Sequence, residues 1–164
     1  MKDISRQFVL FLVFNLIVLS DVIGQVNLPE RRLILSPGLS FQNQVFGEVN
    51  LMYSRLELSH SGTAIYGPRI GIETNFNPEH FIYAPKIGYE LSGLIFSFRG
   101  SAVGYIDNRK LDLRLLPEAG LSLLGAVNLT YGYNIPVSDF RTAEISNHKI
   151  SLITNLNWDL WHAM

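Results

Sequence analysis

The chain has no cysteine and little charge of one sign in excess. The absence of cysteine among 164 residues excludes a disulfide framework and any thiolate metal site. Lysine and arginine number 13 against 14 aspartate and glutamate residues, and the basic residues are scattered rather than clustered. Such a balance creates no long-range field for nucleic acid. We therefore expect one domain, stabilised by backbone pairing and packing, with no nucleic-acid partner.

Long apolar runs are also scarce, and the longest lies at the start of the chain. Residues 8–19, FVLFLVFNLIVL, follow Lys2 and Arg6 and precede a small-residue site at Gly24. A basic segment, an apolar segment and such a site predict a signal peptide over residues 1–24, with the mature domain over residues 25–164. The alternative is a single transmembrane anchor, but a spanning helix needs about twenty apolar residues. The mature chain is therefore either soluble or crosses a membrane as strands.

From residue 33 onward, apolar residues alternate with polar residues. In AIYGPRIGIETNF, residues 64–76, every second position is mostly large and apolar, while Arg69 and Glu73 lie among the positions between. This period is that of β-strands, whose successive side chains point to opposite faces. Similar segments predict about eight strands of roughly ten to thirteen residues. They are residues 33–41, 45–53, 64–76, 81–91, 94–106, 111–121, 127–135 and 150–160.

Turn residues separate these segments. Short signals occur at residues 43–44, 60–62, 77–80, 92–93, 107–110 and 124–125, and only Val137–Asn147 forms a longer connection. Short connections favour antiparallel pairing of successive strands. We therefore predict an all-β fold, an antiparallel up-and-down β-barrel. A few apolar residues fall on the otherwise polar face: Ile34, Phe46, Met52, Ile95 and Val103.

Composition indicates which face of the barrel is inside. The polar face combines small residues with a nearly balanced set of charges, as a narrow lumen requires, whereas the other face is aliphatic and aromatic. These features favour a transmembrane barrel with a polar lumen over a soluble barrel with an apolar interior. The predicted lumen charges are Glu48, Arg69, Glu73, Lys86, Glu90, Arg99, Asp112, Arg114 and Glu118.

One phrase is repeated on two successive strands. GPRIGIE, residues 67–73, and APKIGYE, residues 84–90, each carry a cation and a glutamate on the polar face. Antiparallel pairing is expected to bring Arg69 and Glu73 near Glu90 and Lys86. Proline cannot donate to a strand ladder, so Pro68, Pro85 and Pro117 predict bulges, strand ends or a bend in the wall.

The chain resembles small bacterial outer-membrane barrels, of the eight-stranded kind typified by the OmpA transmembrane domain and OmpX. The phrases that carry this resemblance are GPRIGIE, APKIGYE, RLLPEAGLSLLG and VNLTYGYNIP. It implies export by a signal peptide, residence in the outer membrane, contact with outer-membrane lipid, and recognition by the barrel-assembly machinery through the C-terminal strand. Trp158 and Trp161, in NWDLW, are the residues expected to serve that recognition.

The sequence offers only weak candidates for catalytic residues. All four histidines fall in predicted turns or the tail, and none has a partner at metal-ligand spacing. His148 with Ser151, or His60 with Ser61, are the only starting points for a hydrolase site. We expect no catalytic residue, cofactor or metal. The lumen charges are interpreted as a closed structural network rather than an ion path, because unpaired charges there would be costly.

Three functions remain open. The first is an outer-membrane barrel with a structural or partner-binding role, whose partner loop is expected to present Asp139, Arg141 and Glu144. The second is a secreted, lipocalin-like barrel that holds a small apolar ligand, which requires buried isoleucines and solvated charges. The third is a lipid-modifying outer-membrane enzyme.

Overall fold

Alternating residues form long strands in the computed structural model, which describes residues 31–59 and 62–157. The predicted signal peptide, His60, Ser61, Trp158 and Trp161 lie outside this part of the chain. Within it, no helix is long and apolar enough to cross a membrane. The strands are β1 Arg31–Gln42, β2 Gln44–Ser59, β3 Gly62–Asn75, β4 Tyr83–Gly93, β5 Phe96–Asp107, β6 Lys110–Leu123, β7 Val127–Tyr133, β8 Ile135–Pro136 and β9 His148–Thr154.

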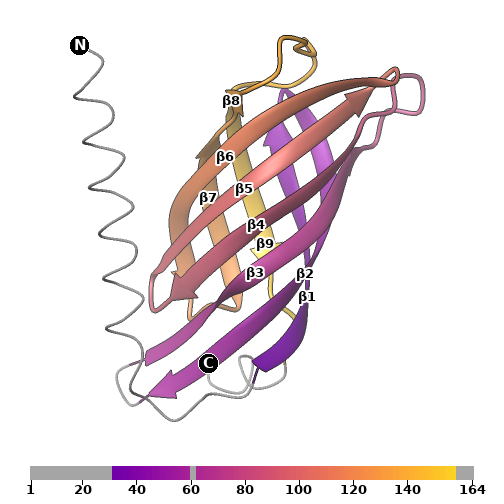
Figure 1. Cartoon of the computed structure of the whole chain (residues 1–164). Coiled ribbons are helices and arrows are strands. Elements are labelled where there is room, and N and C mark those ends of the chain that lie inside the picture. The colour runs from indigo at the N-terminus through magenta and orange to yellow at the C-terminus, as the bar shows by residue number, and fades with distance from the viewer. Residues whose placement is uncertain (1–30, 60–61, 158–164) are drawn as a thin grey trace, which may run out of the picture.

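The strands close into an antiparallel up-and-down barrel (Figure 1). Each strand from β1 to β6 pairs with the strand that follows it in the sequence. β8 also pairs with β6, in the same register as β7, so β7 and β8 are two parts of one wall strand. β9 pairs with β7 and with β1. The sheet therefore has eight wall strands, and the predicted fold is confirmed.

The register sets the stagger of the wall. A path across the strands from Arg31 passes through seven partners and returns to β1 at Phe41, ten residues further on. For eight strands spaced about 4.8 Å apart, with a rise of about 3.3 Å per residue, this stagger gives a tilt of about 41° and a backbone radius of about 8 Å. A wall of this radius encloses side chains rather than a wide pore.

The connections differ between the two ends of the barrel. At the end that we call the loop end, residues 76–82 and 137–147 join β3 to β4 and β8 to β9. The opposite end, which we call the tight-turn end, contains the start of β1 and the turns at residues 94–95 and 124–126. Residues Leu94 and Leu124 take positive φ angles of 50° and 49° in these turns. The predicted turn at residues 92–93 is thus two residues too early, and Ile95 is an exposed turn residue rather than part of the polar face.

The wall prolines interrupt the ladders without shifting them. Beside Pro68, the pairs between β2 and β3 resume in the same register, from Met52 opposite Arg69 to Arg55 opposite Tyr66. The missing proline N–H therefore leaves a local gap, and no residue is inserted. Similar gaps with unchanged register lie beside Pro85 and Pro117. The expectation of bulges is therefore wrong, and β3, β4 and β6 continue through their prolines, although the wall strand opposite Pro117 is divided into β7 and β8. A bend in the wall stays a prediction.

The two faces of the wall differ in chemistry as predicted. Isoleucines of the repeated phrase point outward, with Ile70 57% and Ile87 62% exposed. Their neighbours Arg69 and Lys86 are buried inside at 2% and 6%. Charges therefore occupy the interior, while the outside of the barrel is covered by leucine, isoleucine, valine and aromatic side chains.

Candidate functional site

The interior holds nearly equal numbers of anionic and cationic side chains along the strands. All nine predicted lumen charges are buried, and a tenth, Lys149, joins them. These ten comprise five carboxylates and five cations: Glu48, Glu73, Glu90, Asp112 and Glu118 with Arg69, Lys86, Arg99, Arg114 and Lys149. A further buried carboxylate, Asp107 at the end of β5, lies 2.9 Å from His80 Nε2 and accepts a hydrogen bond from the Thr142 hydroxyl. Compensation of this kind matters because an unpaired charge in this setting would be strongly unfavourable.

One group of charges joins two lysines to two glutamates. Lys86 Nζ lies 2.7 Å from Glu48 Oε2 and 3.2 Å from Glu73 Oε2. Lys149 Nζ is 3.7 Å from Glu48 Oε2 and also donates a short hydrogen bond to Glu73. Gln42 Nε2 donates to Glu73 Oε1 at 3.0 Å. Each carboxylate thus interacts with both cations, which compensates for the loss of water around them.

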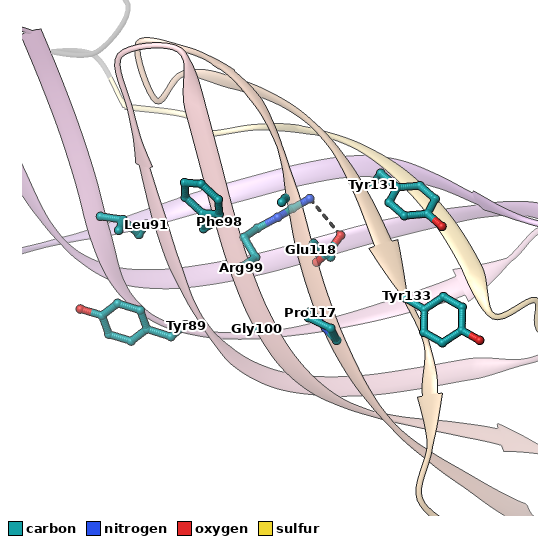
Figure 2. A pocket seen from close by; sticks show the side chains of 10 residues that line it. Tyr89, Leu91, Phe98, Arg99, Gly100, Pro117, Glu118, Tyr131 and Tyr133 are labelled. Atoms are coloured by element: carbon teal, nitrogen blue, oxygen red, sulfur yellow. Dashed lines mark hydrogen bonds and ion pairs between the residues drawn. The ribbon is translucent and has the colours of Figure 1, made fainter. Parts of the chain in front are cut away.

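A second group joins two arginines through one glutamate. Glu118 Oε1 lies 3.0 Å from Arg99 Nη2, and Glu118 Oε2 lies 3.3 Å from Arg69 Nη2. Figure 2 shows the Arg99–Glu118 ion pair between neighbouring strands. Arg69 Nη1 lies 3.4 Å from Glu90 Oε2, and Asn128 and Asn155 both donate to Glu90 Oε1 at 3.1 Å. The group therefore ties together strands that do not pair directly.

The repeated phrase makes the contacts that its register predicts. Arg69 meets Glu90, and Glu73 meets Lys86, across the β3–β4 pair. Sequence reasoning missed Lys149, although its odd position matches that of Ser151 on the polar face. The signal was available, but the strand was predicted to begin at Ile150, two residues too late. The observed β9 begins at His148.

Apolar side chains fill the interior on both sides of these charges. Ile34, Met52, Ile65 and Ala126 form a buried cluster toward the tight-turn end. A second cluster lies toward the loop end and consists of Phe46, Ile82, Ala84, Val103, Tyr105, Leu116 and Ile145. Four of the apolar residues that broke the predicted polar face belong to these clusters. Their inward position has a physical reason, because apolar packing excludes water from the ends of the charged region.

The loop at residues 137–147 folds back over the interior. Arg114 Nη1 donates to the carbonyl oxygens of Ile145 and Ser146 at 3.1 and 3.3 Å. The same guanidinium pairs with Asp112 Oδ2 at 2.7 Å. Asp112 Oδ2 also accepts from the backbone N–H of Thr142 at 2.9 Å. Asp112 and Arg114 thus bind the backbone of the loop, and this role differs from that of the two central charge groups.

The three predicted partner residues of this loop point outward. Asp139, Arg141 and Glu144 are exposed, while Thr142 and Ile145, each next to one of them in the sequence, are buried. The loop therefore has an inner side that contacts the barrel and a charged outer side. The outer side is the part available to a partner.

The weak hydrolase candidate on β9 does not assemble. His148 is exposed on the outer wall, where its Nδ1 lies 2.6 Å from the Tyr131 hydroxyl. Ser151 is buried inside and donates to Glu118 at 3.1 Å. The two side chains lie on opposite faces of the strand. Across the described ranges, no group of three or more histidine or carboxylate side chains could hold a metal ion.

Comparison with protein-family models, curated proteins and solved structures found no match to this chain. The function is therefore argued from the geometry alone.

Proposed function

We propose that this chain is an integral outer-membrane β-barrel with a sealed interior of paired charges, which acts through its outer surfaces. The observation that carries this proposal is the contrast between the two wall faces. Ile70, Ile72 and Ile87 are at least half exposed, whereas Arg69 and Glu90 beside them are almost fully buried. Exposed apolar surface of this extent is costly in water and favourable in lipid.

The eight-stranded meander supports the resemblance to small outer-membrane barrels. In hydrocarbon every backbone amide needs a partner, and a closed sheet leaves no free edge. Two connections at the loop end, residues 76–82 and 137–147, are longer than the described turns at the opposite end, and long loops at one end are usual for such barrels. Assembly through the C-terminal residues Trp158 and Trp161 belongs to the same proposal.

The interior supports a structural role rather than conduction. Ions would have to pass two apolar clusters and a set of charges that already satisfy one another. A barrel of eight strands is filled by side chains, whereas open aqueous channels begin with larger barrels. Purified protein reconstituted in planar bilayers is expected to give no stable conductance step. Regular single-channel steps would contradict the sealed interior.

The deciding experiment is localisation combined with side-chain accessibility. The full chain is produced in a Gram-negative host, and separated membranes are washed with alkaline carbonate. Retention in the outer-membrane fraction is expected. Spin labels at Ile70 and Arg69 should then differ, with position 70 quenched from the lipid phase and position 69 quenched from neither phase. Release into the wash or the periplasm would favour the soluble ligand-binding barrel.

The outer side of the 137–147 loop is the proposed partner surface. Asp139, Arg141 and Glu144 carry both signs of charge, so a mixed polar protein surface is the partner chemistry that fits. We propose no enzymatic activity. A change in outer-membrane lipid composition that depends on His148 would support the enzyme alternative instead.

A further inference from the structure

The outer wall carries two basic side chains directly beside the apolar belt at the tight-turn end. Arg31 in β1 pairs opposite Arg55 in β2, and the next pair of outward residues is Leu33 with Tyr53. Like charges placed opposite each other destabilise a strand pair unless an anion lies between them. Arg31 and Arg55 therefore mark the boundary of the belt with an unusual concentration of positive charge.

A cavity of about 300 Å³ connects these arginines with three tyrosines. Its lining includes Arg31, Arg55, Tyr53, Tyr66 and Tyr89, above Pro68 where the β2–β3 ladder is interrupted. The Arg31 guanidinium lies 5.4 Å from the centre of the Tyr53 ring. Glu57, further along β2, accepts a hydrogen bond from the Tyr66 hydroxyl at 2.7 Å. The cavity thus combines two guanidinium groups with phenol rings at one edge of the apolar wall.

An apolar trough continues from Tyr89 across the next strands. Its floor is Gly100, Pro117 and the small Ala119, and a Cβ atom built at Gly100 would meet no atom within 4 Å. Figure 2 shows Tyr89 and Leu91 on one side of this floor, with Tyr131 and Tyr133 on the other. The trough has a volume of about 640 Å³. Tyr89 lines both the trough and the arginine cavity, so the two lie next to each other.

We propose that the arginine cavity and the trough together bind one anionic phospholipid. The phosphate lies between Arg31 and Arg55, and an acyl chain passes Tyr89 into the trough. This inference rests on the membrane setting proposed above. Gly100 lies three strands from Arg55 and two residues further toward the loop end, which at the 41° tilt amounts to about 14 Å along the barrel axis. That distance matches the extent of one leaflet, about half of the 30 Å hydrocarbon thickness.

Charge and shape select this occupant over a second copy of the chain. A phosphate is complementary to the paired guanidinium groups, which bind such oxygens with directed hydrogen bonds. A two-fold dimer would place each trough against its own copy, and two concave surfaces leave a void. An acyl chain fills a groove of this kind without a complementary ridge.

The headgroup is tested by native mass spectrometry of the purified full-length barrel in detergent. Dioleoyl phosphatidylglycerol and dioleoyl phosphatidylcholine are titrated separately, and retained lipid is counted. One tightly held phosphatidylglycerol is expected. The double variant Arg31→Gln with Arg55→Gln should weaken its binding about 25-fold, since each basic residue near an anionic surface contributes roughly fivefold. Arg109→Gln with Arg141→Gln removes the same charge at the loop end and should leave binding unchanged.

The acyl trough is tested by filling it. Gly100→Leu places a side chain on the floor and should weaken phosphatidylglycerol retention several-fold, while Val49→Phe, on another part of the outer wall, should not. Equal retention in Gly100→Leu, or displacement by inorganic phosphate alone, would overturn the lipid site in favour of an ion site. Equal binding of the two lipids would also overturn it. Carbonate washing of the wild-type membranes separates these outcomes from failure of the membrane proposal, since the wild type would then be released.

Discussion

The inward and outward faces of the same strands are specified in different ways. Lys86 and Ile87 are neighbours in β4, yet Lys86 ends within 3.2 Å of two particular carboxylates while Ile87 is 62% exposed on the outer wall. The inward residue depends on the identity of its partners. The outward residue depends mainly on being apolar. Inward substitutions should therefore be judged by pairing, and outward substitutions, in the proposed membrane setting, by transfer to lipid.

Removing one inward carboxylate is expected to have the largest effect. Glu73→Gln keeps the volume but leaves Lys86 and Lys149 with a single shared glutamate. Breaking a buried pair typically costs about 3–5 kcal/mol of unfolding free energy. Urea unfolding in lipid vesicles, followed by gel mobility, measures the loss. Glu79→Gln, in the exposed 76–82 loop, is the control and should change stability by less than about 0.5 kcal/mol. Equal stability of the two variants would refute the interdependence of the inner charges.

Placing a cation on the outward face tests the other half of the comparison. Ile87→Lys places a positive charge on the outer face of the wall, next to Lys86, whose charge lies inside the barrel. A lysine at the membrane midplane costs about 2–4 kcal/mol, and the cost falls to about 0–1 kcal/mol near the boundary. The same unfolding measurement should therefore show a large loss for Ile87→Lys and a small one for Phe81→Lys, near the loop end. A harmless Ile87→Lys would indicate that this wall faces water.

Replacing glycine by alanine should also destabilise the barrel more on the inward face than on the outward face, with a smaller effect than the charge substitutions. A Cβ at inward Gly120 would lie 2.0 Å from the Leu129 carbonyl oxygen in the neighbouring strand. Gly120→Ala is therefore expected to cost about 1–3 kcal/mol through overpacking. Outward Gly100→Ala meets no neighbour and should be neutral, or stabilising by less than about 1 kcal/mol. Similar values for both would mean that the wall at Gly120 relaxes freely.

The faces of the barrel could be predicted from the sequence because one physical signal, the period of two, runs through every strand. The repeated phrase also predicts the Arg69–Glu90 contact, because proline and the charged residues stand at the same spacing in two adjacent strands. Lys149 was missed only because the last strand was predicted to begin two residues late. Such boundaries depend on hydrogen bonds that a residue pattern does not report.

Other features had no local signal. The turn at Leu94 and Ile95 contains no turn-forming residue, and pairing on both sides imposes the positive φ of Leu94. The gaps beside the prolines could not be distinguished from bulges, because both remove one ladder contact and only the register differs. The inner side of the 137–147 loop was also hidden. Its contacts with Arg114 join residues about thirty positions apart.

The smallest expected effect comes from the outer side of that loop. Replacing Asp139, Arg141 and Glu144 together by serine should change unfolding free energy by less than about 0.5 kcal/mol, since all three are exposed. Thr142→Ala should cost about 1–2 kcal/mol, because it leaves Asp107 without the 2.6 Å hydrogen bond from the Thr142 hydroxyl. A stability loss in the triple variant as large as that of Thr142→Ala would show that the outer side also holds the barrel closed. The charged outer side would then no longer be free to bind a partner independently of the fold, and the contrast between structural inner residues and available outer residues would fail at the loop.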